Sequence, residues 1–291
     1  MPRVSVDGMK FYYQQAGQGP DVVLIHGVTG NMAIWPLINL IDVLATEFRV
    51  TAYDMRGHGY SDTPLTDYTS ADMAHDLKKL QDALGLGPMY LLGHSFGGVV
   101  ATHMAVLYPD AVAGMILSDP SFPALRHLEE KVTEWHGWVD YVQQSRRAGL
   151  TVSAEAWYDV DDLLKQCANL PAEFEQTFDA EVGPGALRRL KRLAVTTCGR
   201  DASEVAGLTA AAIASIRHPV IALYGERSPF LNTCRYLEDN LVNCKVVLVP
   251  GGEHRAHEES PAAYVELVQR SFRDLVHFSG SWEFAAEAAT R

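Results

Sequence analysis

The stretch Tyr90 to Gly98 reads YLLGHSFGG and places Ser95 between Gly93 and Gly97 at the end of an apolar run. The residues that follow, GGVVATHMAVLYP, are rich in small side chains, as in a helix packed closely on a sheet. A G-x-S-x-G turn between a strand and a helix forces the serine into a strained, exposed position, because glycine tolerates the close backbone approach. The stretch therefore predicts a strand, a sharp turn and a helix, with Ser95 as a candidate nucleophile.

Similar apolar runs, rich in β-branched residues, recur on both sides of this stretch with helical segments between them. Besides residues 89–95, they lie at 21–26, 49–54, 112–119, 219–225 and 245–251. Before them, residues 4–17 have the pattern of an antiparallel hairpin that turns at Asp7-Gly8. Strands that alternate with helices predict an α/β fold, in which helices flank a mainly parallel sheet.

One connection is too long for a single crossover helix, because roughly 100 residues separate the runs that end at Asp119 and begin at Pro219. Helical patterns in this interval break at Pro171 and at 183–185. We predict a helical cap over residues 122–216, and a core formed by residues 1–121 and 217–291. Six aromatic residues of the cap are candidates either for a pocket lining or for the interior of the cap: Trp135, Trp138, Tyr141, Trp157, Tyr158 and Phe174.

Composition restricts the partners. The 291-residue chain carries a formal net charge of −12, which disfavours binding to nucleic acid or to an anionic membrane surface. Four cysteines without metal-like spacing are read as free thiols of a cytoplasmic protein. The start of the chain lacks a leader-like apolar region, and no run is long enough for a membrane span. A small-molecule partner is expected, and an oligomer stays open.

With these features the chain resembles the α/β-hydrolase family over about residues 10–277. HGVTG at 26–30 and DMRGHGYSD at 54–62 are similar to two loops of that family. The resemblance implies an eight-stranded, mostly parallel sheet with a helical cap after the sixth strand. It also implies an oxyanion hole formed by the backbone N–H groups of Val28 and Phe96. The histidines of these loops and of the serine turn, His26, His58 and His94, are expected to make structural hydrogen bonds.

A serine nucleophile needs a base, because its hydroxyl is a poor nucleophile at neutral pH. After the last apolar run, the segment beginning at His254 is similar to the family pattern G-H-x-x-x-x-E-x-P, with Glu253 in place of the usual glycine. His257 is the rival base, but the spacing to Pro261 favours His254. A metal site formed by HRAHE is disfavoured, because it lacks the H-E-x-x-H order and lies in a predicted loop.

The orienting acid departs from the family pattern. Most resembling hydrolases carry it as G-x-x-D after the penultimate strand, whereas this chain reads GERS with Ser228 at the expected position. Glu226 is one alternative. The other is Asp119, which ends the strand after the nucleophile, as in certain haloalkane dehalogenases and zearalenone lactone hydrolases. Asp119 is favoured although Asp-Pro is also a common turn, because the order serine, acid, histidine is kept.

The sequence thus predicts a serine hydrolase, without cofactor or metal, that cleaves a carboxylic ester, lactone or thioester through an acyl-enzyme on Ser95. A serine at this position argues against dehalogenase or epoxide hydrolase chemistry, which uses a carboxylate nucleophile in this fold. Four alternatives stay open. Three use the same triad, namely carbon–carbon bond hydrolysis, acyl transfer and cofactor-free haloperoxidase chemistry. The fourth is a non-catalytic ligand receptor, suggested by Ser228 and Glu253.

Overall fold

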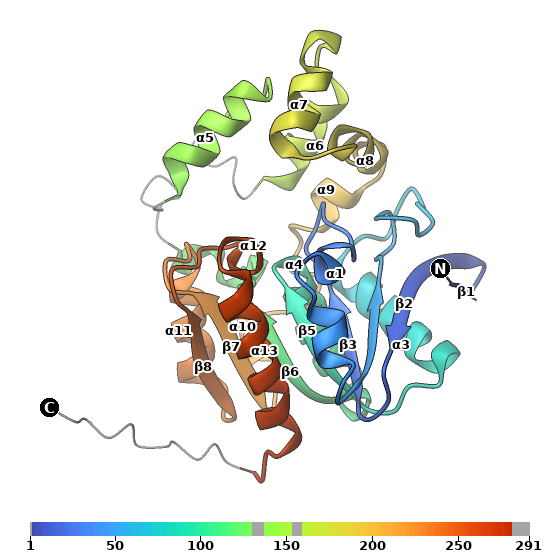
Figure 1. The fold of residues 1–291 in the computed structure, drawn as a ribbon, viewed down its shortest axis with the longest axis vertical. Helices are drawn as coiled ribbons and strands as arrows, with labels where there is room; N and C mark the ends of the chain where they lie inside the picture. Colours follow the sequence, from blue (N-terminus) through green and yellow to red (C-terminus); the bar gives the residue numbers. More distant parts are fainter. Residues whose placement is uncertain (1, 130–136, 153–158, 281–291) are drawn as a thin grey trace, which may run out of the picture.

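The computed structural model describes residues 2–129, 137–152 and 159–280, which form one layered α/β structure (Figure 1). The chain begins with the predicted hairpin of β1 (Arg3–Val6) and β2 (Met9–Ala16). Its turn residues Asp7 and Gly8 have φ values of 48° and 81°, which are the left-handed values that a two-residue hairpin turn requires. The hairpin prediction is confirmed.

The remaining strands add to this hairpin and form one eight-stranded sheet in the order β1-β2-β4-β3-β5-β6-β7-β8. They are β3 (Asp21–Ile25), β4 (Arg49–Tyr53), β5 (Met89–His94), β6 (Val112–Ser118), β7 (Val220–Gly225) and β8 (Cys244–Val249). The pairs from β3 to β8 are parallel, whereas β2 runs antiparallel to β1 and β4. The six predicted runs match the six parallel strands to within two residues at each end, so the loops at their carboxyl ends meet along one edge.

Helices cover both faces of the sheet, because side chains alternate in direction along each strand. On β3, Val23 packs in the cluster that includes α3 (Ser70–Leu84), α4 (Phe96–Leu107) and α11 (Leu231–Asn240). Its neighbour Leu24 faces the other cluster, which includes α2 (Leu40–Leu44) and the last helix α13 (Pro261–Val276). Shorter helical segments complete the core: α1 (Ile34–Leu37), η1 (Pro109–Ala111), α10 (Ala210–Ala214) and α12 (Ala256–Glu259).

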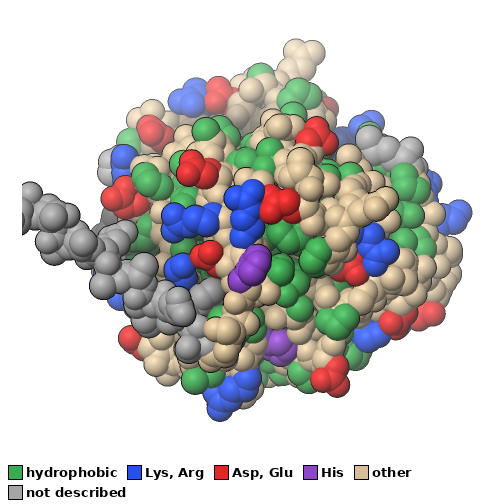
Figure 2. All heavy atoms as spheres, turned by 60° about the horizontal axis from the view of Figure 1, so that its bottom comes forward, with side chains coloured by type: hydrophobic (Ala, Val, Ile, Leu, Met, Phe, Trp, Pro, Cys, Tyr) green, Lys and Arg blue, Asp and Glu red, His purple; other side chains and the backbone are tan. Residues whose placement is uncertain are grey.

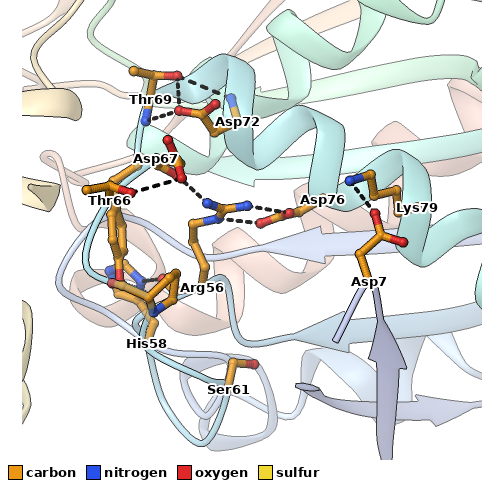
Figure 3. A network of polar contacts seen from close by, with 12 residues as sticks. Asp7, Arg56, His58, Ser61, Thr66, Asp67, Thr69, Asp72, Asp76 and Lys79 are labelled. Atoms are coloured by element: carbon orange, nitrogen blue, oxygen red, sulfur yellow. Dashed lines mark hydrogen bonds and ion pairs between the residues drawn. The ribbon is translucent and has the colours of Figure 1, made fainter. Parts of the chain in front are cut away.

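The loop after β4 is fixed to α3 by a polar network (Figure 3). The Arg56 guanidinium donates to both carboxylate oxygens of Asp76, at 2.5 and 2.6 Å, and to the Asp67 carbonyl at 2.6 Å. Thr69 and Asp72 form a capping box at the start of the helix, which satisfies backbone N–H groups that would otherwise lack acceptors. The network holds this loop in place beside the carboxyl edge of the sheet.

Between β6 and β7 the chain forms mostly helices, as predicted. They are η2 (Pro123–Leu128), α5 (Trp138–Arg147), α6 (Val160–Ala168), η4 (Ala172–Phe174), α7 (Glu175–Val182), α8 (Ala186–Ala194) and α9 (Cys198–Asp201). In Figure 1, α5 to α8 lie together above one end of the sheet. Arg192 of α8 joins them to the core, because its Nη2 donates to the carbonyls of Gly57 at 2.9 Å and Gly59 at 2.8 Å. The exact domain limits, 121/122 and 216/217, stay a prediction.

The surface carries charges of both signs. On the face shown in Figure 2, Lys and Arg side chains alternate with Asp and Glu side chains. Some charged side chains of the protein pair, as Arg273 does with Glu47 at 2.5 Å and Lys245 with Asp274 at 2.9 Å. None of the helices within the described ranges combines the length and the apolar character needed to span a membrane.

Candidate active site

Ser95 occupies the turn between β5 and α4, as the sequence predicts. Its φ of 52° and ψ of −121° are strained for a non-glycine residue. The flanking glycines are required sterically, since a Cβ on Gly93 would lie 2.2 Å from the Gly97 carbonyl oxygen, and one on Gly97 would lie 2.4 Å from that of Ile25. Ser95 remains partly exposed although its neighbours are buried. The turn therefore presents its hydroxyl at the carboxyl edge of the sheet.

Asp119 follows β6 directly and is almost completely buried, with 1% of its surface exposed. Its φ of 54° is also left-handed. Its Oδ2 accepts a hydrogen bond from the Gly225 N–H at 2.9 Å, and its Oδ1 accepts one from the Ser228 hydroxyl at 2.7 Å. Donors of this kind stabilise an ionised carboxylate, which can only accept hydrogen bonds.

His254 lies in the loop between β8 and α12, and its Nδ1 is 3.0 Å from Asp119 Oδ1. Since an ionised carboxylate accepts, Nδ1 carries the proton and Nε2 of the neutral ring is left as an acceptor. The ring is held edge-on by Phe230, with ring centroids 5.0 Å apart. The structure therefore brings together the carboxylate and the imidazole that the sequence favours.

His94, the residue before Ser95, holds the base loop in place. Its Nε2 donates to the backbone carbonyl of His254 at 3.0 Å. Burial, with the charges that His257 and His254 can carry, holds the pKa of His94 well below its usual value, so the ring stays neutral. At Glu253, where the family pattern has glycine, the backbone N–H donates to the Glu259 carboxylate at 2.5 Å.

The two rival residues take other positions. Glu226 is exposed, and its Oε2 accepts from the Gly251 N–H at 2.9 Å. His257 is 2% exposed and packs edge-on against His94, with centroids 4.3 Å apart. The buried Asp119 carboxylate instead accepts its imidazole hydrogen bond from His254 Nδ1.

A cavity of about 430 Å³ opens over Ser95 and His254. Such a volume is typical of small-molecule sites. Val28 and Phe96 line it together with residues of the inserted helices. Phe96 is the first residue of α4, so its N–H has no acceptor within the helix. Among the residues that the structure describes, neither this N–H nor that of Val28 meets another acceptor. Both amides can therefore serve an anion in the cavity.

Of the six aromatic residues of the cap, Tyr141 lines the cavity. Trp138 packs against Tyr141, with centroids 5.6 Å apart, and Phe174 packs in the hydrophobic cluster beside Gly149. Trp135, Trp157 and Tyr158 lie outside the described residues. Helical spacing alone could not tell a cavity-lining aromatic residue from one packed inside the cap, because both recur with the same helical period.

His26 and His58 hold the loop that carries Val28. His26 Nε2 accepts from the Met55 N–H at 3.1 Å, and His58 Nε2 accepts from the Thr29 N–H at 3.2 Å. Burial lowers the pKa of His26 to about 4 and that of His58 to about 3. Both rings are therefore neutral, and their expected structural role agrees with these bonds.

These two pKa values predict how stability depends on pH. In the unfolded chain an imidazole titrates near about 6.5, so below that pH the unfolded state binds more protons than the folded state does. We expect the free energy of unfolding to fall as the pH drops from 6.5 towards 4, by up to about 1.4 kcal/mol per pH unit for each ring. Urea denaturation at a series of pH values measures this. His58→Gln should flatten the slope and the exposed control His127→Gln should not; a wild-type stability that is constant across this range would contradict the prediction.

No group of three His, Cys, Asp or Glu side chains in the described ranges is arranged to hold a metal ion. The sequence singled out His94 and Ser228 but not their partners, which are the His254 carbonyl and the Asp119 carboxylate. The cavity-lining arginines Arg126, Arg189 and Arg255 carried no recognisable sequence signal. The contacts of His94 and Ser228 depend on how separate strands meet. Arg189 lines the cavity because of how α8 docks, whereas Arg126 lies on η2 and Arg255 directly precedes α12.

Comparisons with known proteins identify the fold family. A family model described as alpha/beta hydrolase fold matches residues 20–261. The chain is 29% identical over 276 residues to 2-(acetamidomethylene)succinate hydrolase of Mesorhizobium japonicum, covering 91% of this chain and 92% of that protein. A solved structure of E-2-(acetamidomethylene)succinate hydrolase shares 26% identity and a TM-score of 0.62, covering 94% and 98%. An N-acyl homoserine lactone degrading enzyme, at 23% identity and a TM-score of 0.65, covers 93% and 100% and shares the fold.

Proposed function

Since the chain belongs to the α/β-hydrolase fold family, we propose that it hydrolyses a carboxylic ester, lactone or thioester through an acyl-enzyme on Ser95. The observation that carries this proposal is the hydrogen bond from His254 to the buried Asp119, because His254 lines the same cavity as Ser95. Nucleophile, base and acid thus come from three loops at one edge of the sheet, where parallel α/β folds place their sites.

In the proposed reaction, His254 Nε2 takes the proton of Ser95 as the Oγ attacks the substrate carbonyl carbon. The carbonyl electrons move to the oxygen, and the N–H groups of Val28 and Phe96 hold the resulting oxyanion. Collapse of this intermediate expels the alcohol or thiol, which receives its proton from His254. Water then attacks the acyl-enzyme with His254 again as base, and the carboxylic acid leaves.

Asp119 completes the arrangement by keeping the proton on Nδ1 and by stabilising the imidazolium that forms in each step. Because Asp119 is buried and bonded on both oxygens, it holds the ring in one orientation. The name of the rhizobial relative, a hydrolase of a substituted succinate, supports hydrolysis rather than acyl transfer to another acceptor.

Two experiments test this function. A hydrolysis screen over esters, lactones and thioesters of graded acyl length should find turnover, and carbon–carbon and perhydrolysis substrates should be slower. A fluorophosphonate probe should label Ser95 in the folded protein. A folded protein that neither hydrolyses any acyl substrate nor reacts with the probe would instead support the ligand-receptor alternative.

A further inference from the structure

We propose that the substrate carries a carboxylate and that Arg189 binds it. This inference rests on the proposed function, since it names the substrate class of the same cavity. Three arginines line the cavity, Arg126, Arg189 and Arg255, together with the acidic residues Asp159 and Glu258. Positive charge thus gathers at this cavity although the whole chain has a net charge of −12.

The acidic lining residues are already engaged. Glu258 pairs with Arg255 in the turn after the base, so those two charges offset each other. Asp159 caps α6, because its Oδ1 accepts from the Asp162 N–H at 2.8 Å. A negative charge at a helix N-terminus is stabilised by the helix dipole, which favours keeping Asp159 in that role.

Arg189 has guanidinium N–H groups available for a ligand. It lies on α8 and is half-buried, and its Nη1 donates to the Pro184 carbonyl at 2.9 Å. In the described part of the chain, its Nε and Nη2 meet no acceptor and it pairs with no carboxylate. A guanidinium presents its donors in a planar fork that fits a carboxylate, and such charge-assisted bonds are among the strongest in proteins. The helix itself is held to the core by Arg192, which fixes where Arg189 stands.

The test compares monoethyl succinate with ethyl butanoate, in which a methyl group replaces the carboxylate. We expect kcat/KM to favour monoethyl succinate by about tenfold or more, mainly through KM. Arg189→Gln should reduce this preference to about twofold or less, because the carboxylate loses its partner. Arg188→Gln is the matched control, because Arg188 is adjacent on the same helix but is exposed and does not line the cavity.

A binding measurement does not depend on turnover. Succinate should raise the Tm of the wild type and of Arg188→Gln, but not that of Arg189→Gln. Hydrolysis of ethyl butanoate without any preference for monoethyl succinate, or the same Tm shift in both variants, would overturn this inference and leave the proposed function standing. A wild-type protein that hydrolyses no acyl substrate, but whose Tm still rises with succinate, would refute the proposed function instead.

A second inference comes from the hydrogen bonds of the acid. We infer that Ser228 is a positioning residue that sets the basicity of the Asp119–His254 pair. Its Oγ accepts from the Phe230 N–H at 2.9 Å, so its own proton points to Asp119 Oδ1 at 2.7 Å. That oxygen also receives the His254 Nδ1 proton, and Ser228 is 6% exposed. The hydroxyl thus draws negative charge away from the oxygen that stabilises the imidazolium.

Removing this donor should make Asp119 a stronger acceptor and favour protonated His254. For Ser228→Ala we expect the acidic limb of the pH profile of kcat/KM to move to higher pH by about half a unit, with kcat on the plateau within about tenfold of wild type. Ser228→Thr, which keeps the hydroxyl, should show the acidic limb at the wild-type pH. The low-field NMR resonance of the His254 Nδ1 proton reports the same change without turnover. If Ser228→Ala shifts neither the acidic limb of the kcat/KM profile nor the resonance of the His254 Nδ1 proton, the inference is overturned.

Discussion

Replacing Ser95 by alanine is expected to lower kcat by about 10⁵-fold or more, because the acyl-enzyme can no longer form. The binding cavity and the amides of Val28 and Phe96 would remain, so a small residual rate over the uncatalysed reaction is expected. The strained backbone at position 95 is tolerated by alanine as much as by serine, so the variant should fold. Steady-state kinetics on the best ester from the screen measure the loss.

The matched control for this variant is Ser121→Ala, which removes another hydroxyl from the lining of the same cavity. It should change kcat by no more than a few-fold, whatever it does to KM. Fluorophosphonate labelling should disappear in Ser95→Ala and persist in the control. If Ser95→Ala keeps more than about one per cent of wild-type turnover, the serine mechanism is wrong, since loss of a triad nucleophile lowers turnover far more than a hundredfold.

Asp119→Asn is expected to lower kcat by about 10³- to 10⁴-fold. The asparagine oxygen can still accept from the Gly225 N–H, which turns the amide NH₂ towards Ser228 and His254. An NH₂ group facing Nδ1 forces the proton onto Nε2, and the ring can then no longer take the proton of Ser95. The predicted loss therefore comes from the wrong tautomer rather than from a missing contact.

Glu226→Gln is the matched control, because Glu226 is the other candidate acid and is exposed. It should stay within a few-fold of wild type. Rescue provides the sharper test. Ser228 Oγ lies 2.7 Å from Asp119 Oδ1, so a carboxylate introduced as Ser228→Asp in the Asp119→Asn background should recover part of the lost rate. Near-normal turnover of Asp119→Asn, with a large loss in Glu226→Gln, would reverse the assignment of the acid.

The sequence predicted the sheet and the serine turn well because both are encoded locally. A strand is marked by its own apolar run, and the turn at Ser95 needs glycines at fixed positions on either side. Asp119 could be named only through the resemblance, from the serine that replaces the usual acid at 228. How Asp119 is bonded could not be predicted, because its partners Gly225 and Ser228 lie more than a hundred residues later in the chain.

The cavity lining was the least predictable part. The cationic segment from Arg188 to Arg192 illustrates this, because Arg188 is exposed to solvent. Arg189 lines the cavity and Arg192 bonds the core, although one helix carries all three. Adjacent positions on a helix point about 100° apart, so docking decides which of them meets a ligand. Composition cannot supply that information.

The bond from the Gly225 amide to Asp119 also bears on how the protein acquires activity during folding. It joins positions 106 residues apart, on either side of the inserted helices, and the Asp119–His254 contact spans 135. Contacts between such distant positions form late, since closing a long stretch of chain costs entropy before the contact can repay it. A nascent chain that has passed the nucleophile turn holds one member of the machinery and lacks the other two. The contacts of Asp119 with Gly225 and His254 therefore form only once the carboxyl-terminal strands have docked, so a partly folded chain lacks them.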